Sequence, residues 1–369
     1  MKKILEVFGE PISAGGQESF VFNVLKYMDL SDMHVDILTP YYCENDYYRK
    51  MIEDIGGNIV ALELPFSPGK SRFNIIKPID TYLKRNHYDV LHVHSGSISI
   101  LAEVAVIAHR HHISKIIVHS HCAAEYKTIK YRIIKFIATP ILNRYPTNHI
   151  ACSLVAGEWK YSKRIVNNHL TILKNGVDLD KFTFNKLIRE KMRNKLNISK
   201  NTYVVGHVGR FCYQKNHEFI INLFEKLKQQ YDDCILLLIG NGENIDSIQE
   251  LVEEKKLEAA VKFLGNVSNV NDYMQAMDVF VLPSYFEGLP IVGVEAQANG
   301  LPTFVSTNVS HELLLSDAIE FISLDNQDEW VQKLLANINS KRYVTGDDLT
   351  INGYNIETTA QELRKIYED

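Results

Sequence analysis

Two cationic side chains that could bind phosphate lie in the stretch YVVGHVGRFCYQKNHEF, which begins at Tyr203. Arg210 and Lys215 follow an apolar run that predicts a buried strand, and Gly209 lets the backbone approach a ligand closely. Arginine offers a planar fork for phosphate oxygens, whereas lysine offers a movable point charge. Loop arginines and lysines are most often simply solvated, but a position directly after a buried strand favours a phosphate site.

A second candidate anion site lies at residues 282–300, LPSYFEGLPIVGVEAQANG. The apolar run at 278–282 predicts a buried parallel strand, which a loop joins to a helix. Gly288 is expected to take a positive φ, Pro290 to occupy the first helical position, and Gly300 to end the helix in a left-handed conformation. The free N–H groups at the start of such a helix bind anions.

Two carboxylates bracket this predicted helix start. Glu287 lies just before it and Glu295 lies inside it, with seven residues between them. Because carboxylates repel phosphate, these two are expected to accept hydrogen bonds from hydroxyl groups on the same ligand. The pattern therefore predicts a ligand that has both a phosphate group and sugar hydroxyls.

The loop GEPISAGGQESF follows the first expected strand, at residues 3–8. Gly15 and Gly16 allow close approach to a ligand, the helix after them points its N-terminus there, and Glu18 could assist. Taken alone, these residues describe a flexible loop equally well.

Four histidines end the fourth and fifth expected strands, in LHVHSG and IVHSHCAAEY. They are His92, His94, His119 and His121. One histidine at a strand end is usually structural, and four suggest a metal. However, the spacing supplies no recognisable set of cysteine or carboxylate ligands, so no metal site is predicted.

A basic segment, residues 110–164, has ten Lys and Arg against two Asp and Glu. Within TIKYRIIKFIATPILNRY one helical face is apolar, and the cations lie elsewhere. The apolar positions are Ile129, Ile133, Phe136 and Ile137, and the cations are Lys127, Lys130, Arg132 and Lys135. Two interpretations remain open. The helix is solvated and packs on its own sheet, or it contacts anionic lipid headgroups or a lipid-pyrophosphate acceptor.

Apolar strands alternate with amphipathic helices along the chain, which predicts parallel sheets covered on both faces. In the first half, strands are expected at 3–8, 34–38, 58–62, 90–94, 115–119 and 149–152; in the second, at 203–208, 235–239, 261–264, 278–282, 303–305 and 320–322. These describe an α/β protein with two doubly wound, Rossmann-like domains facing each other across a cleft, with ligands bound beyond the strands' carboxyl ends. The expected domains are 1–177 and 178–355, and the join falls in a polar, Lys-rich stretch between Val177 and Ser199.

Composition limits the class of protein. The chain has 369 residues, which suffice for two domains. Hydrophobic residues make up 46% and charged residues 23%, which is typical of a soluble globular protein, and the net charge is -5. Five cysteines without a CxxC pair favour a reduced, cytoplasmic setting. The start MKKILEVFGEPIS is interpreted as a strand and not as a signal peptide, and no apolar run is long enough to span a bilayer.

The stretch SYFEGLPIVGVEAQANG resembles the donor motif of retaining family-4 glycosyltransferases with the GT-B fold, and much of the remaining chain resembles their capsular and exopolysaccharide subgroup. The resemblance implies that Arg210, Lys215 and Glu287 act in catalysis, together with His119 at the cleft. It implies a donor-binding set of Gly15, Gly16, Gly209, Gly240, Leu264, Gly288, Leu289, Pro290 and Glu295. The subgroup commonly has asparagine where this chain has Cys122, so one polar contact is in question. In this fold the last helix, expected from about Ile356 to the end, usually packs back on the first domain.

The resemblance also implies a reaction. A sugar would move from a nucleotide sugar, expected to be a UDP-hexose or UDP-N-acetylhexosamine, to a glycan or lipid-pyrophosphate-linked acceptor. No cofactor and no metal are expected, because Arg210 and Lys215 would stabilise the diphosphate charge. No nucleic acid is expected as a partner, and the enzyme would work in the cytoplasm or on the inner face of the membrane.

Two alternatives stay open. One is a non-hydrolysing UDP-sugar epimerase on the same fold, and the other is a catalytically silent binding subunit of a polysaccharide assembly complex. The paired Glu287 and Glu295 favour transfer over epimerisation. A nicotinamide dehydrogenase is the least favoured, because no three-glycine fingerprint opens either domain.

Overall fold

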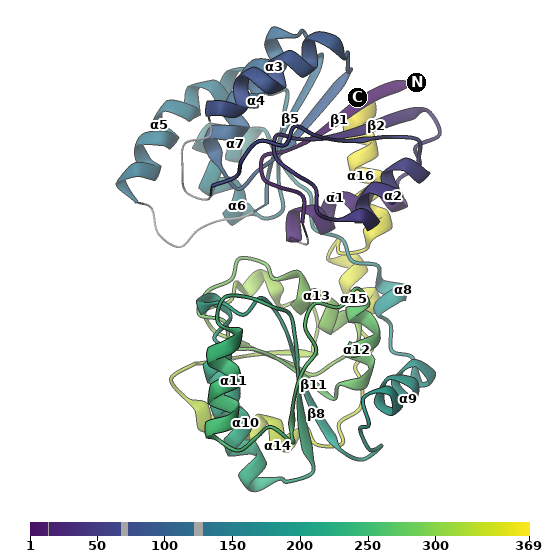
Figure 1. Cartoon of the computed structure of the whole chain (residues 1–369), viewed down its shortest axis with the longest axis vertical. Helices are drawn as coiled ribbons and strands as arrows, with labels where there is room; N and C mark the ends of the chain where they lie inside the picture. Colours follow the sequence, from purple (N-terminus) through teal and green to yellow (C-terminus); the bar gives the residue numbers. More distant parts are fainter. Residues whose placement is uncertain (14, 68–72, 122–127) are drawn as a thin grey trace. The chain divides into compact units, whose positions relative to one another are not determined.

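The computed structural model describes residues 1–13, 15–67, 73–121 and 128–369, which divide into two units. The first unit holds Met1–Gly176 together with Ile356–Asp369, and the second holds Val177–Asn355 (Figure 1). Val177, expected at the end of the first domain, belongs to the second unit. Its backbone N–H donates to the carbonyl of Tyr354 at 2.7 Å, and its side chain lies in the core of the second unit.

The first unit is built on a parallel sheet of seven strands among the described residues, in the order β3-β2-β1-β4-β5-β6-β7. The strands are β1 (Lys2–Phe8), β2 (Met33–Thr39), β3 (Ile59–Ala61), β4 (Val90–His94), β5 (Lys115–Ser120), β6 (Asn148–Ala151) and β7 (Leu170–Ile172). The helices are α1 (Gly16–Tyr27), α2 (Asp46–Asp54), η1 (Phe73–Ile75), α3 (Ile76–Arg85), α4 (Ile98–Arg110), α5 (Ile129–Arg144), α6 (Leu154–Lys160) and α7 (Lys163–Asn168).

The last helix, α16 (Ile356–Glu368), completes this unit by packing beside α1 (Figure 1). Its apolar residues Ile356, Ala360 and Leu363 are buried in the same core as β1. Lys2 Nζ donates to the carbonyl of Tyr367 at 2.7 Å, which ties the helix to the first strand.

The second unit contains a parallel sheet of six strands among the described residues, in the order β10-β9-β8-β11-β12-β13. The strands are β8 (Tyr203–Val208), β9 (Cys234–Ile239), β10 (Val261–Phe263), β11 (Val279–Leu282), β12 (Thr303–Ser306) and β13 (Ile319–Ile322). The helices are α8 (Leu179–Phe182), α9 (Lys186–Lys195), η2 (Tyr213–Lys215), α10 (His217–Gln230), α11 (Ile245–Glu254), α12 (Val270–Ala276), α13 (Ile291–Ala298), η3 (His311–Leu313), α14 (Gln327–Ala336) and α15 (Gly346–Ile351).

Both sheets are parallel with buried central strands, as the near-continuous apolar runs predicted. β11 shows the reason: all four of its residues are fully buried, because helices cover both faces of the sheet. The predicted strands appear within a residue or two of their expected bounds, and β7 was not predicted. β7 is a three-residue edge strand with two exposed side chains, so its sequence lacks the apolar signal of a buried strand.

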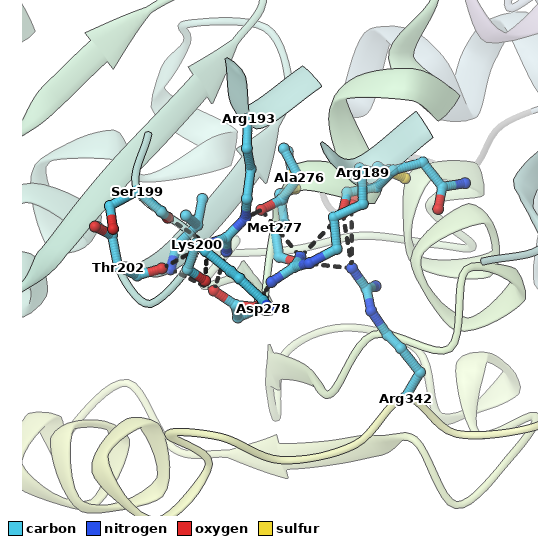
Figure 2. A network of polar contacts seen from close by, with 12 residues as sticks. Arg189, Arg193, Ser199, Lys200, Thr202, Ala276, Met277, Asp278 and Arg342 are labelled. Carbon is cyan, nitrogen blue, oxygen red and sulfur yellow. Dashed lines mark hydrogen bonds and ion pairs between the residues drawn. The ribbon is translucent and has the colours of Figure 1, made fainter. Parts of the chain in front are cut away.

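Three arginines join distant segments of the second unit at the amino end of β11, as Figure 2 shows. Arg189 and Arg193 hold the two carboxylate oxygens of Asp278 at 2.5 and 2.6 Å. Arg342 donates to the carbonyl of Met277 at 2.6 Å, and all three arginines bond carbonyls at the end of α12. They therefore satisfy helix carbonyls that lack partners within the helix. This network lies at the opposite end of the strands from the edge where such sheets bind ligands.

Within the described ranges, no helix combines the length and the apolar character that crossing a membrane requires.

Candidate functional site

The strand order of each sheet marks where a ligand should bind. In the second unit the chain runs from β8 outward through β9 and β10 and then returns to β11 on the other side of β8. Loops that leave the carboxyl ends of β8 and β11 therefore diverge and leave a crevice between them, the usual ligand position in doubly wound sheets. In the first unit the same reversal occurs between β1 and β4.

Lys215 and Glu287 meet at the reversal in the second unit. Lys215 lies in the loop after β8 and Glu287 in the loop after β11, with 2.5 Å between Nζ and Oε1. Both side chains are largely buried, at 15% and 10% exposed, so they hold each other in a defined geometry. The sequence predicted each as a site residue, and the structure brings the two together.

Hydrogen bonds between the two loops fix this ion pair. Ser284 Oγ donates to Glu287 Oε1 at 3.1 Å. The backbone N–H of Tyr285 donates to the carbonyl of Gln214, and the Gln214 side chain donates to the carbonyl of Phe286, both at 2.9 Å. Ser284 and Gln214 are functional candidates that the sequence analysis missed, because only the folded loops show what they contact.

Helix α13 begins directly after this ion pair. It starts at Ile291, so its first N–H groups face the loop that contains Gly288 and Leu289. Two expectations were wrong. Pro290 is the N-cap and not the first helical residue, and Gly288 does not have a positive φ. Since φ is not positive and the space around Gly288 is open, neither the backbone angle nor a close approach requires glycine at this position.

The other end of α13 agrees with the prediction. Gly300 has φ +69°, and a Cβ at this position would lie 2.3 Å from the carbonyl oxygen of Tyr343. Only glycine fits, because both the backbone angle and the close approach exclude a side chain.

Glu295 lies on α13, about one helical turn after the first residue of the helix, Ile291. Burial raises the pKa of Glu295 to about 7, and the charge of Lys181 opposes that rise. Near neutral pH this carboxyl group can therefore both donate and accept hydrogen bonds, which suits a contact with hydroxyl groups. Lys181 is a neighbour that sequence analysis did not single out.

Arg210 is placed differently from Lys215. Its side chain is 71% exposed, and Nε bonds Glu243 Oε2 at 3.0 Å. An exposed ion pair of this kind holds its members only weakly, which leaves Arg210 able to turn toward a ligand. The structure does not join it to the Lys215–Glu287 pair, where the sequence had placed it.

Glycines around Arg210 let the loops contact one another. The N–H of Gly209 donates to the carbonyl of Ile239, and the N–H of Gly240 donates to that of Gly265, both at 2.9 Å. A Cβ on Gly240, which has φ +132°, would lie 2.1 Å from the carbonyl oxygen of Gly209. Leu264 N–H donates to Leu238, so the loops after β8, β9 and β10 form one edge.

The glycine loop of the first unit follows β1, at the reversal between β1 and β4. Gly15 is the N-cap of α1, and a Cβ there would lie 2.4 Å from Glu18 Oε2. Gly16 has open space around its Cα. Burial raises the pKa of Glu18, whose carboxylate also receives backbone hydrogen bonds from this loop. The loop is thus held by Glu18, and the adjacent residue 14 lies outside the described part.

His119 lies in the interior of the first unit. It is fully buried on β5, and its Nδ1 lies 3.2 Å from His92 Nε2. Burial, together with neighbouring histidines, holds the pKa of His119 well below its usual range, so its ring is neutral. Its Nε2 is buried with no hydrogen-bond partner among the described residues. The predicted site residue is therefore a neutral imidazole with one unused nitrogen.

Three of these histidines could in principle hold a metal ion. The ring nitrogens of His92, His94 and His119 lie within 4.8 Å of one another. However, His94 Nε2 bonds Glu6 Oε2 at 2.7 Å, and His92 already pairs with His119. A metal at this place would have to replace the hydrogen bond between His92 and His119.

The basic helix α5 has an exposed apolar face. Ile129 and Phe136 are 77% and 82% exposed, and Ile133 and Ile137 are exposed beside them. Lys130 and Arg132 are also exposed. Lys135 is half-buried, and its Nζ donates to the carbonyls of Glu158 and Trp159 at 2.8 and 2.6 Å. Lys127 and Cys122 lie outside the described residues.

Two family models match the chain and together span most of it. The model described as Glycosyltransferase Family 4 matches residues 14–181, and the one described as Glycosyl transferases group 1 matches residues 188–341.

Three curated relatives match most or all of the chain. EpsF of Bacillus subtilis (strain 168), whose name assigns it to the glycosyltransferases, is 28% identical over 99% of this chain and 96% of its own length. The capsular polysaccharide biosynthesis glycosyltransferase CapH of Staphylococcus aureus is 23% identical over 100% of this chain and 99% of its own length. The third relative is an Escherichia coli UDP-Gal:alpha-D-GlcNAc-diphosphoundecaprenol alpha-1,3-galactosyltransferase. It is 26% identical over 78% of this chain and 77% of its own length.

Solved structures share the fold. Anabaena HepE in complex with UDP superposes with a TM-score of 0.77 at 17% identity, covering 99% of both chains.

Proposed function

The chain belongs to the family 4 glycosyltransferases and has their GT-B fold, and on that premise we propose that it is a retaining hexosyltransferase of surface polysaccharide biosynthesis. Its donor would be a UDP-hexose or a UDP-N-acetylhexosamine. Its acceptor would be a glycan or a lipid-pyrophosphate-linked sugar.

The observation that supports this proposal most directly is the Lys215–Glu287 ion pair at the reversal between β8 and β11. Breaking the anomeric bond leaves negative charge on the diphosphate, while the sugar gains oxocarbenium character. A fixed cation and a helix N-terminus stabilise charge where it develops, and their geometry needs no reorganisation during the reaction. Lys215 and the start of α13 supply both, and Glu287 places a carboxylate beside them for the sugar hydroxyls.

Retention would follow from attack on the same face of the sugar. No side-chain nucleophile is assigned, so the donor phosphate itself would take the proton from the acceptor hydroxyl. Lys215 and Arg210 would stabilise the negative charge on the diphosphate, and no metal or other cofactor is assigned to the reaction.

The relatives supply the choice of substrates. HepE has been solved with UDP, and the galactosyltransferase relative is named for a UDP-sugar donor and a diphosphoundecaprenol-linked acceptor. Carried to this chain, these names favour a UDP-sugar and a lipid-linked acceptor.

A lipid-linked acceptor requires the protein to reach a membrane surface. The exposed apolar face of α5, flanked by Lys130 and Arg132, fits an anionic bilayer by both its shape and its charge. We therefore place the enzyme on the inner face of the cell membrane, as a peripheral protein.

The test is a transfer assay that begins with the donor. A panel of nucleotide sugars is first screened for thermal stabilisation, because a ligand at ~100 times its dissociation constant adds ~2.7 kcal/mol. The stabilising donor is then incubated with and without polyprenyl-pyrophosphate sugars. Formation of an α-linked product from an α-linked donor would support the proposal. Epimerised donor, or binding without turnover, would reject it in favour of an epimerase or a silent binding subunit.

A further inference from the structure

Six polar side chains lie together inside the first unit. They come from β1, from the ends of β4 and β5, and from α16: Glu6, His92, His94, His119, His121 and Tyr367. All are fully buried except His121, which is partly buried. Buried polar groups need hydrogen-bond partners, and these six side chains find most of theirs in one another.

Glu6 sets the direction of these hydrogen bonds. Burial acts to raise the pKa of Glu6, but His92 and His94 lower it, and the result lies below its ordinary value. The carboxylate is therefore ionised and can only accept. It accepts from His94 Nε2 at 2.7 Å on one oxygen and from the Tyr367 hydroxyl on the other.

One relay runs from Glu6 through His94. Because His94 Nε2–H donates to Glu6, the other nitrogen of the neutral ring must accept. Its donor is His121 Nε2–H, at 2.8 Å from His94 Nδ1. Burial lowers the pKa of His94 to about 4 and that of His121 well below its usual range, so both rings are neutral. His121 Nδ1 is then an unprotonated acceptor.

A second relay runs through Tyr367 and His92. Since the Tyr367 hydroxyl gives its hydrogen to Glu6, its oxygen accepts from His92 Nδ1–H at 2.8 Å. Followed in the same direction, this relay has His92 Nε2 accept from His119 Nδ1–H at 3.2 Å. His119 Nε2 is then an unprotonated acceptor as well.

Both relays end on nitrogens without a protein partner. His119 Nε2 and His121 Nδ1 are buried and unpaired among the described residues, and the two rings stack with centroids 3.9 Å apart. A buried polar atom left unsatisfied costs about 1–3 kcal/mol, so two on adjacent rings indicate a place for hydrogen-bond donors that the protein does not supply.

We propose that Glu6 and Tyr367 are positioning residues that fix His119 and His121 as paired acceptors for the hydroxyl groups of the sugar substrate. The inference rests on the proposed function, and it adds His121 as a second imidazole contact beside His119. Because solvent does not reach either nitrogen in this structure, substrate binding must be accompanied by movement of neighbouring side chains, among which Phe20 packs against both rings.

The first measurement is the tautomer of each ring, from nitrogen NMR of protein labelled at histidine. His119 should show a proton on Nδ1 and His121 a proton on Nε2, with signals assigned from His119→Gln and His121→Asn. In Glu6→Gln the side-chain amide can donate to His94, which reverses the relay and should move the proton of His121 to Nδ1. Glu103→Gln is the matched control, since Glu103 is a half-buried carboxyl group on α4 outside the cluster.

The second measurement is kinetic. Glu6→Gln should lower kcat about 10–100-fold, as loss of a carboxylate behind a functional histidine does at metal sites, with a smaller change in KM. Tyr367→Phe should also lower kcat more than it changes KM, but by a smaller factor. This variant replaces Glu6→Gln in the test if Glu6→Gln does not fold. Tyr161→Phe is its control, because this buried hydroxyl donates to the backbone carbonyls of Val118 and Ile150 and not to the cluster.

The outcomes separate the two proposals. Unchanged tautomers and unchanged kcat in Glu6→Gln, in a wild type that transfers sugar, would overturn the relays and leave the proposed function intact. A wild type with the expected tautomers that binds and transfers no sugar would overturn the proposed function, and with it the role of the two acceptors in holding hydroxyl groups.

Discussion

At the residue scale, Lys215 has two partners to consider: Glu287 in the structure and the diphosphate in the proposed reaction. If it stabilises the charge that develops on the leaving group, Lys215→Ala should lower kcat on the order of 10²–10³-fold, by analogy with the loss of one oxyanion donor. Steady-state transfer kinetics with saturating donor measure this effect. Lys255→Ala is a suitable control, because it also removes an ion pair, with Glu225 at 2.6 Å. A kcat like that of the wild type would remove Lys215 from the mechanism.

Glu295 provides a prediction about pH. The pKa of this carboxyl group rises from its ordinary 4.5 to about 7 in the folded protein because of burial. Between these two values the folded state binds a proton that the unfolded state has released, so this group makes the protein less stable as pH rises through that range. Glu295→Gln cannot titrate and should lack this loss.

Urea unfolding of wild type and Glu295→Gln at a series of pH values tests the point. The difference in unfolding free energy between the two should move in favour of the variant from about pH 4.5 to about pH 7 and then level off. A difference that is independent of pH would mean that the carboxyl group titrates normally.

At the scale of elements, helix α5 is expected to bind membranes through its apolar face. Replacing Phe136 and Ile137 by serine should reduce binding to anionic vesicles by about tenfold or more, since burying one large apolar side chain contributes about 1.5–3 kcal/mol. Cosedimentation measures this, and wild-type binding should weaken as salt rises. Leu187→Ser is the control, because Leu187 is 76% exposed on α9 of the other unit. Equal binding by all three proteins would mean that α5 is only a solvated helix.

The end of helix α13 makes a prediction about stability. In Gly300→Ala the new methyl group would meet the carbonyl oxygen of Tyr343 in a backbone conformation that disfavours it, so unfolding should become easier by more than about 1 kcal/mol. Gly346→Ala, at the open start of α15, should be neutral or slightly stabilising. Chemical denaturation compares them, and equal stabilities would show that the strain at Gly300 is relieved elsewhere.

At the scale of the whole molecule, the proposed reaction takes its positive charge and its helix dipole from the second unit of the chain itself. If Lys215, Arg210 and the start of α13 stabilise the diphosphate, transfer should continue essentially unchanged in EDTA. Assays with and without chelator, after dialysis, test this. Activity that is lost in EDTA and restored by Mg²⁺ or Mn²⁺ would mean that a metal carries the diphosphate charge instead.

The sequence predicted the two sheets because their signal is long and repeated. Each buried strand is an apolar run, and each run is separated from the next by an amphipathic helix, so errors in single elements do not change the fold. The exception, β7, is short and at an edge, where exposed side chains weaken the pattern.

The site was less predictable, because it depends on contacts between loops. Glycines and charges marked the loops after β8 and β11, yet nothing local shows that Gln214 bonds Phe286 and thereby brings Lys215 to Glu287. The same applies to the buried histidines. The resemblance marked His119 as a site residue, but only the folded sheet places Glu6 and Tyr367 among the four histidines.

The hydrogen bond between Tyr367 and Glu6 joins residues 361 positions apart. During synthesis the ribosome releases Glu6 long before Tyr367, and the whole second unit is translated in the interval. Until Tyr367 is synthesised, Glu6 lacks one of the donors that it has in the complete first unit, although early domains generally fold first. The first unit therefore completes its hydrogen bonds only after the second unit has been translated.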